Sequence, residues 1–156
     1  AGTFKGKLYI ETSKKYASDV NVCYQVGEGL VELVEAGKAD SPEVTELLHR
    51  YVDPMVDCNI DHLVLGCTHY PFLMSSLRGI LPKGVEIVDP APAVARQTLR
   101  VLSEYNLLNN GISQGKLAFY SSASVEVLKL LAEKLGIISD HEQAVAFTGS
   151  VKPCEH

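Results

Sequence analysis

The sequence predicts an α/β fold with a mostly parallel sheet flanked by helices, and three observations favour it. Short β-rich runs alternate along the chain with longer segments of helical periodicity, which is typical of α/β domains. The run over residues 62–65 is apolar almost throughout, as expected for a strand that is covered on both faces. Glycine and proline stand at the ends of several helical segments, where they favour helix ends and starts.

The first part of the chain is predicted to be mainly helical. The expected elements are a helix over residues 7–17, a strand over residues 20–23, a short helix over residues 28–36 and a long helix from Ser41. Ser41 suits the N-cap of the long helix and Pro42 its first position. Apolar side chains recur at steps of three and four residues from Val44 to Met55, so one face of this helix should be buried.

After the apolar strand at residues 62–65 the alternation continues to the end of the chain. The expected elements are a helix from Pro71, a strand over residues 85–88, a helix over residues 91–105, a strand over residues 116–120, a helix over residues 124–135 and a strand over residues 144–147.

Composition excludes several classes of protein. Hydrophobic residues make up 46% of the 156 residues and charged residues 21%, which is the balance of a globular protein. The formal net charge of −5 argues against nucleic acid as a partner, because phosphate binding needs a basic surface. No apolar stretch approaches the ~20 residues of a membrane span, and the start lacks the apolar core of a secretory signal. We therefore expect a cytoplasmic protein without a membrane partner.

A thiol and an imidazole follow the apolar strand, where residues 63–73 read LVLGCTHYPFL. In parallel α/β folds, ligands bind beyond the carboxyl ends of strands, where loops lead into helices. A helix N-terminus would stabilise a thiolate at Cys67, and a protonated His69 would add to that effect. We therefore expect Cys67 and His69 to form a reactive pair beside a carboxylate-binding loop.

Two other interpretations of this cysteine remain open. Free cysteine is among the most buried residue types, so Cys67 could simply be packed in the core. A zinc site of Cys58, Cys67 and His69 would need a fourth ligand, which is not evident, and we expect no metal site. No lysine motif for pyridoxal phosphate and no glycine-rich dinucleotide loop is present, so we expect no organic cofactor.

The segment LVLGCTHYPFL resembles the second cysteine motif of the glutamate racemases, which are cofactor-independent bacterial enzymes. Three further segments resemble that family in the same order: GT-x-K-G-x-LY over residues 2–9, LVELVEAG over residues 30–37 and VEIVDPAPAVA over residues 85–95. The resemblance covers nearly the whole chain. It implies interconversion of L- and D-glutamate, which supplies D-glutamate for peptidoglycan and thus for cell-wall biogenesis.

Racemisation requires two acid/base groups on opposite sides of the α-carbon, and the resemblance implies that both are cysteines. Cys67 matches the second of them, and His69 matches the histidine that assists it. Thr68 matches a residue that binds the substrate carboxylate, and Gly66 is assigned to the same substrate site.

The resemblance also implies an acidic residue near the substrate ammonium. Glu35, within LVELVEAG, matches it best, and Glu32 is the alternative.

The chain departs from the family in its opening. The family carries an Asp-Ser-Gly segment and an Asn-Thr segment with the first cysteine, and neither is found in this sequence. Residues 1–86 resemble the second of two racemase domains without its opening strand, and residues 87–156 the part that completes the first domain. We expect the chain to be inactive alone, because it holds one catalytic thiol, and to form homo-oligomers through exposed sheet edges.

Two alternatives to a glutamate racemase remain. The first is an aspartate or hydantoin racemase of the same superfamily, and the second is a non-catalytic α/β partner module in which Cys67 is merely packed.

Overall fold

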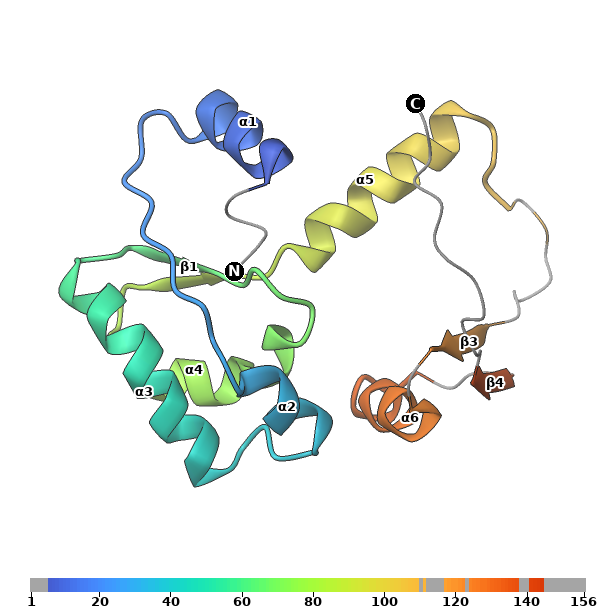
Figure 1. Ribbon diagram of the computed structural model, residues 1–156. Helices are drawn as coiled ribbons and strands as arrows, with labels where there is room; N and C mark the ends of the chain where they lie inside the picture. The colour runs from blue at the N-terminus through green and yellow to red at the C-terminus, as the bar shows by residue number, and fades with distance from the viewer. Residues whose placement is uncertain (1–5, 110, 112–116, 123, 138–140, 145–156) are drawn as a thin grey trace. The chain divides into compact units, whose positions relative to one another are not determined.

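The computed structural model describes residues 6–109, 111, 117–122, 124–137 and the backbone of 141–144, which form two compact units (Figure 1). Unit 1 comprises the described residues up to Val34 and those of Lys38–Arg96. Unit 2 comprises Glu35–Gly37 and the described residues from Gln97 onward. Within the described residues, no helix has the length and apolar character that a membrane span requires.

Unit 1 contains most of the helices and the first pair of strands. Its elements are α1 (Lys7–Tyr16), α2 (Leu30–Glu35, whose last residue is counted with unit 2), α3 (Pro42–Asp57), β1 (His62–Val64), the 3₁₀ helix η2 (Tyr70–Leu73), α4 (Met74–Ile80), β2 (Glu86–Val88) and the start of α5 (Ala91–Glu104).

Helix α3 forms as its sequence predicts. The Ser41 hydroxyl accepts a hydrogen bond from the Val44 backbone N–H at 3.4 Å, and Pro42 occupies the first turn, where a missing N–H is harmless. Val44, Leu48 and Val52 are buried and lie on one face. The predicted amphipathic helix is confirmed, and its buried face supplies much of the core of unit 1.

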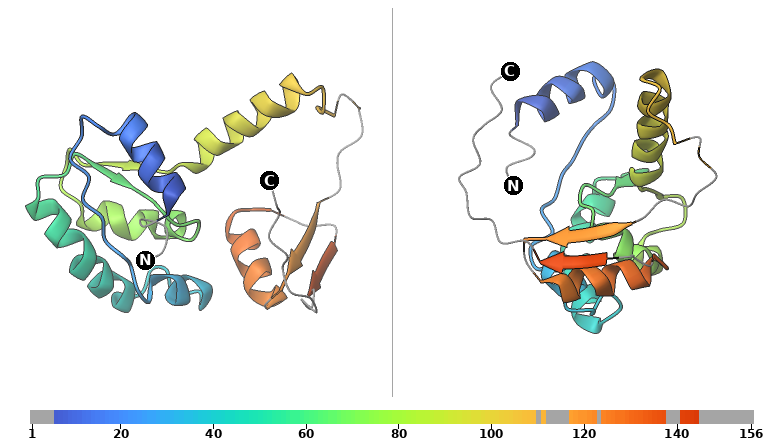
Figure 2. Two further views of the ribbon diagram at one scale, coloured as in Figure 1. Left: turned by 45° about the horizontal axis from the view of Figure 1, so that its top comes forward. Right: turned by 90° about the vertical axis from the view of Figure 1, so that its right-hand side faces the viewer.

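Strands β1 and β2 pair in parallel, in the register His62–Glu86, Leu63–Ile87 and Val64–Val88. The strand prediction at residues 62–65 is confirmed, but the expectation that both faces are covered is wrong. Side chains alternate between the faces of a strand, and here Leu63 is 7% exposed whereas Val64 is 63% exposed. Figure 2 shows the reason: α3 and α4 lie on the same side of the two strands.

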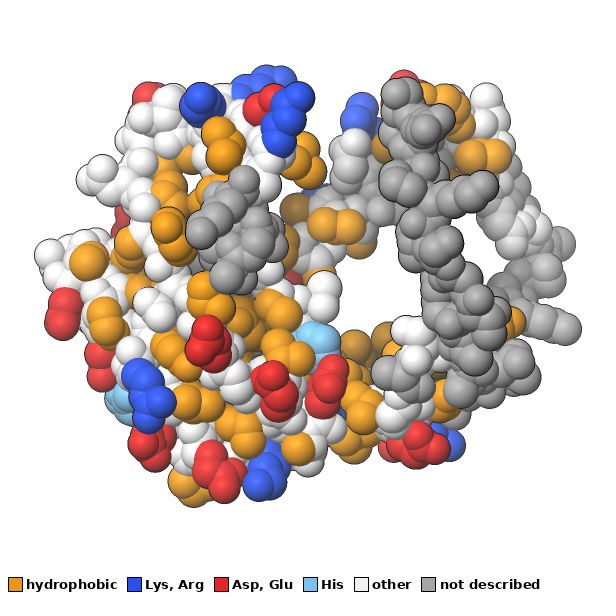
Figure 3. Space-filling view, viewed as in Figure 1, with side chains coloured by type: hydrophobic (Ala, Val, Ile, Leu, Met, Phe, Trp, Pro, Cys, Tyr) orange, Lys and Arg blue, Asp and Glu red, His pale blue; other side chains and the backbone are white. Residues whose placement is uncertain are grey.

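The segment before α2 also departs from expectation. The predicted strand over residues 20–23 is wrong, because residues 21–27 have no regular secondary structure and pair with no strand among the described residues. Val20 and Val22 are 61% and 54% exposed. The predicted helix over residues 7–17 is confirmed as α1, although none of its residues is buried. Hydrophobic side chains accordingly show at the surface of unit 1, interleaved with acidic ones (Figure 3).

The helix expected from Pro71 forms in two parts. It opens as η2 and becomes α-helical only at Met74. Helix α5 follows β2 as predicted, and the Asp89 carboxylate accepts a hydrogen bond from the Ala91 backbone N–H at 2.9 Å. This side chain therefore satisfies one of the backbone donors at the start of α5.

Unit 2 repeats the α/β pattern on a smaller scale. Beyond α5 it contains β3 (Ala118–Ser121), α6 (Val125–Lys134) and β4 (His141–Ala144), with β3 and β4 paired in parallel. The predicted helix over residues 124–135 is confirmed as α6, and the Ser124 hydroxyl caps it by accepting a hydrogen bond from the Val127 backbone N–H at 3.2 Å. The sequence predicts a strand over residues 144–147. Residue 144 is the last residue of β4, and residues 145–147 lie outside the described residues.

The predicted α/β class with parallel pairing is confirmed. Among the described residues the strands form two separate parallel pairs, β1–β2 and β3–β4, in place of one continuous sheet.

Candidate functional site

Cys67 and His69 lie in the turn that follows β1. Strand β1 is extended beyond its last residue, because the Leu65 backbone N–H donates to the Val88 carbonyl at 3.0 Å. The chain then turns, and the Tyr70 backbone N–H donates to the Cys67 carbonyl at 3.1 Å. These two backbone bonds hold the turn at the carboxyl edge of the β1–β2 pair, where α/β folds place their ligands.

The turn brings the thiol and the imidazole together. Cys67 Sγ lies 3.8 Å from His69 Nδ1, within hydrogen-bonding distance for sulfur, and both side chains are half-buried. A thiol can donate its proton to a neutral imidazole nitrogen, and a thiolate can accept one from an imidazolium. The pair can therefore exchange a proton, which is what an acid/base group at an α-carbon must do.

The two residues assigned to substrate binding flank the thiol. Gly66 and Thr68 are both exposed, and a Cβ added at Gly66 would meet no atom within 4 Å. The surface beside Cys67 is thus open at Gly66, and both backbone and hydroxyl groups are accessible there.

Tyr70 connects this turn to the loop that precedes α2, a contact that the sequence did not reveal. Its hydroxyl donates to the Gly27 carbonyl at 3.5 Å, and the Tyr51 hydroxyl of α3 donates to the next carbonyl, that of Glu28, at 2.9 Å. A Cβ at Gly27 would lie 2.7 Å from Tyr70 Oη and 2.6 Å from Leu30 Cδ1. Two tyrosines therefore anchor the loop, and glycine permits the close approach.

Burial raises the pKa of Tyr70, and negative charge on Cys67 and Glu32 raises it further, against the hydrogen bond to Gly27, which lowers it. The phenol thus stays protonated and can keep donating its hydrogen bond. The only sequence signal for this contact is the pair Gly27 and Gly29 ahead of α2, since small residues mark places where the chain is closely approached.

The two candidate acids, Glu32 and Glu35, lie on the same helix but are counted with different units. Glu32 lies in the first turn of α2, in unit 1, and its charge acts on Tyr70. Glu35 ends the same helix, is exposed and is counted with unit 2. The charge of Glu32 thus acts on Tyr70, which follows Cys67 and His69 in the chain.

The helix after Cys67 stabilises a thiolate at that residue less than the sequence predicted. Cys67 precedes His69, the N-cap residue of η2, and α4 is seven residues long and starts only at Met74. The macrodipole acts over the first turn of a helix and needs aligned peptide units, so its effect at Cys67 is small. His69 is the partner that the structure provides.

No metal centre accompanies these residues in the parts of the chain that the structure describes. There, no group of three or more histidine, cysteine, aspartate and glutamate side chains is arranged to hold an ion. Cys58, the other cysteine considered as a zinc ligand, is exposed at the C-cap of α3.

Comparison with known proteins relates this turn to a family of isomerases. A sequence model described as Asp/Glu/Hydantoin racemase matches residues 2–98, a range that includes α1 to β2 and the Cys67 turn. The glutamate racemase of Pseudomonas putida is 42% identical over 145 residues, which is 93% of this chain and 54% of that protein.

Solved structures of glutamate racemases also match the chain. A glutamate racemase isoform of Bacillus anthracis matches with a TM-score of 0.80 and 25% identity, over 94% of this chain and 55% of that one. The glutamate racemase of Francisella tularensis, solved in complex with D-glutamate, matches with a TM-score of 0.76 and 26% identity, over 88% of this chain and 52% of that one. The chain therefore spans about half the length of the relatives that it matches.

Proposed function

The chain belongs to the Asp/Glu/hydantoin racemase family, and on that premise we propose that it contributes one of two acid/base groups to the cofactor-independent interconversion of L- and D-glutamate. The observation that carries the proposal is the 3.8 Å pair of Cys67 and His69 at the carboxyl edge of β1, within the matched residues. The names of the relatives supply the substrate. The product D-glutamate would serve peptidoglycan synthesis in the cytoplasm of a bacterium.

In the proposed reaction, the Cys67 thiolate removes the α-proton from one enantiomer of glutamate. The Cα–H bond breaks, an S–H bond forms, and the electron pair moves into the substrate carboxylate. Thr68 and the backbone at Gly66 would hold that carboxylate, while His69 exchanges the thiol proton with its own ring nitrogen. A second thiol on the opposite face then returns a proton to the carbon, which inverts its configuration.

An acid near the substrate ammonium completes the proposed site. The family resemblance favours Glu35 for this role, whereas the charge of Glu32 acts on Tyr70 beside Cys67. We keep Glu35 as the assignment and Glu32 as its alternative, and substitution of each by glutamine separates them.

The second thiol would come from the half of the relatives that this chain does not span. We propose that residues 1–86 correspond to the second racemase domain and residues 87–156 to the part that completes the first. A single thiol can remove a proton but cannot deliver one to the opposite face, so the 156-residue chain by itself should not racemise glutamate. Self-association of the chain through exposed sheet edges belongs to the same proposal.

The test compares this chain alone with a chimera that joins it to the unmatched half of the Pseudomonas putida glutamate racemase. Conversion of L- and D-glutamate is followed by circular dichroism and chiral chromatography. We expect no conversion by the chain alone and clear conversion by the chimera. Cys67→Ser in the chimera should lower the rate by about 10³-fold, as for loss of an acid/base group. Cys58→Ser, at an exposed cysteine outside the site, is the matched control.

Three outcomes would contradict the proposal. Conversion by the chain alone would show that no second thiol is needed. An undiminished rate for the Cys67→Ser chimera would remove Cys67 from the chemistry. A strong preference of the chimera for aspartate would favour an aspartate racemase, an activity that the family description includes.

A further inference from the structure

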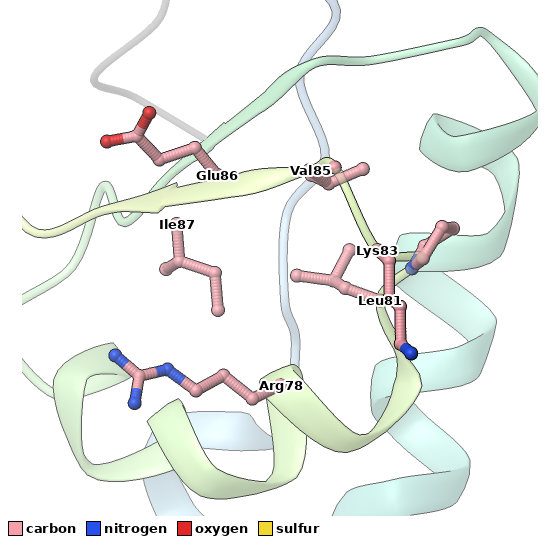
Figure 4. Close-up of a pocket in the computed structure, with 8 residues that line it drawn as sticks. Arg78, Leu81, Lys83, Val85, Glu86 and Ile87 are labelled. Carbon is pink, nitrogen blue, oxygen red and sulfur yellow. The ribbon is translucent and has the colours of Figure 1, made fainter.

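A pocket of about 400 Å³ opens between the C-terminal end of α4, the loop that follows it and the start of β2 (Figure 4). This volume lies within the roughly 300–1,000 Å³ of small-molecule sites. The pocket is lined by Arg78, Leu81, Pro82, Lys83, Gly84, Val85, Glu86 and Ile87. It is built within unit 1 from one continuous stretch of chain.

The pocket and the Cys67 turn lie at opposite ends of the paired strands. Strands β1 and β2 are parallel, so their amino ends share one edge of the sheet and their carboxyl ends the other. The pocket lies at the amino end of β2, whereas Cys67 follows the carboxyl end of β1. A ligand in this pocket would therefore occupy the opposite edge from the proposed catalytic turn.

Two apolar side chains form part of the pocket wall. Leu81 and Ile87 project into the space between α4 and β2 in Figure 4, and both are half-buried. The Arg78 side chain runs beneath Ile87, so its aliphatic stem continues the wall below that side chain, and its guanidinium points away from Lys83.

The charge at the pocket is positive. Within the described residues, Arg78 and Lys83 form no ion pair, and both are exposed. Glu86, the one acid in the lining, turns away from Arg78 in Figure 4, and its Oε2 lies 3.5 Å from His62 Nε2. Because neighbouring residues of a strand point to opposite faces, Glu86 faces away from the pocket while Ile87 faces into it.

We propose that this pocket binds a small organic anion, whose carboxylate or phosphate head contacts Arg78 and whose apolar part lies against Leu81 and Ile87. A cation in the last turn of α4 also suits the helix dipole, which accounts for a positive charge at Arg78. The dipole does not account for the second cation at Lys83, on the other side of the pocket, or for the apolar side chains of Leu81 and Ile87 between the two. The proposal is independent of racemase activity, since it concerns the other edge of the sheet.

The test is a titration of the full 156-residue chain, labelled with ¹⁵N, with hexanoate, hexyl phosphate, inorganic phosphate and neutral hexanamide. We expect hexanoate and hexyl phosphate to shift the amide signals of residues 78–87, inorganic phosphate to bind more weakly, and hexanamide not to bind. The tighter of the two hexyl probes identifies the head group. Arg78→Ala should weaken binding about tenfold or more, as expected for loss of a charged hydrogen bond, and Arg78→Lys should restore part of it.

Arg50→Ala is the matched control, because it removes one exposed arginine from α3 without touching the pocket. It should leave binding unchanged, and the dispersion of the amide spectrum verifies that each variant is folded. The proposal is overturned if no probe shifts residues 78–87, if hexanamide binds as well as hexanoate, or if Arg50→Ala weakens binding as much as Arg78→Ala.

Discussion

The long helices α3 and α5 are both amphipathic, yet they differ in how far their apolar faces are buried. Each carries apolar residues along one face and polar residues along the other. Helix α3 buries Val44, Leu48 and Val52, whereas α5 buries none of its residues, and Leu99 is 59% exposed. The same contrast separates the units, since among the described residues Ala132 is the only buried hydrophobic residue of unit 2. Amphipathic periodicity thus specifies a helix and its apolar face, but burial depends on what packs against that face.

The largest expected effect is on the free energy of unfolding, and it comes from truncating one buried and one exposed leucine. Leu73→Ala in η2 removes a side chain that is 1% exposed, so it should lower the free energy of unfolding by about 2–5 kcal/mol. Leu99→Ala in α5 should change it by no more than about 0.5 kcal/mol, because that side chain is already in water. Urea unfolding followed by circular dichroism measures both, and equal losses would show that α5 is buried in solution.

An intermediate effect is expected from the helix caps, which are closely matched in the two units. Ser41 and Ser124 each accept a backbone N–H three residues on, and each hydroxyl also donates to a glutamate two residues on. Replacing either serine by alanine should cost about 1 kcal/mol, since a cap is a local interaction. Hydrogen exchange at the first turns of α3 and α6 gives the measurement. A much larger loss at Ser41 would mean that core packing, and not the cap alone, depends on it.

The smallest effect is the pH dependence of two exposed groups, one in each unit. A hydrogen bond to the Asp61 carboxylate raises the pKa of His62 above 6.5, and the charge of Glu86 adds to this. The stability that protonated His62 contributes is complete below pH 6.5 and is lost as pH rises through its folded-state pKa. In unit 2 a hydrogen bond from the Ser124 hydroxyl lowers the pKa of Glu126 below 4.5. The stability that ionised Glu126 contributes is therefore present above pH 4.5 and is lost as pH falls through the folded-state pKa.

Titration of both groups by NMR measures these opposite directions. Asp61→Asn should return the His62 midpoint toward 6.5, and Ser124→Ala should return the Glu126 midpoint toward 4.5. A His62 midpoint that stays high in the Asp61→Asn variant would assign the shift to Glu86 instead.

Much of the local structure was predictable because its causes lie within a few residues of chain. The start of α3 follows from Ser41 and Pro42, and the end of α6 from Gly136, whose φ of +67° suits glycine. The position of Cys67 and His69 just after β1 could be predicted for the same reason. Their separation of two residues and the backbone bonds of the turn bring sulfur and imidazole together. Their roles in catalysis stay predictions.

Contacts between distant segments could not be predicted in this way. Residues 20–23 have the composition of a strand, yet a strand forms only where another lies beside it. The apolar run of β1 indicated two covered faces, and Val64 is exposed because helices pack on one of them. Tyr70 and Gly27 are 43 residues apart, and the glycines before α2 indicate a close approach without indicating which residue makes it.

The sequence by itself determined the starts of α3 and α6, the alternation of helices and strands from β1 onward, and a thiol and an imidazole at the end of a strand. Those features depend on backbone dihedrals, capping groups and spacing, which act over a single turn. Only the tertiary structure decided which apolar faces are buried, which tyrosines hold the loop before α2, and that Arg78 and Lys83 line one pocket with Leu81 and Ile87. Those features depend on which surfaces meet in space, because burial and close contact are properties of two segments together.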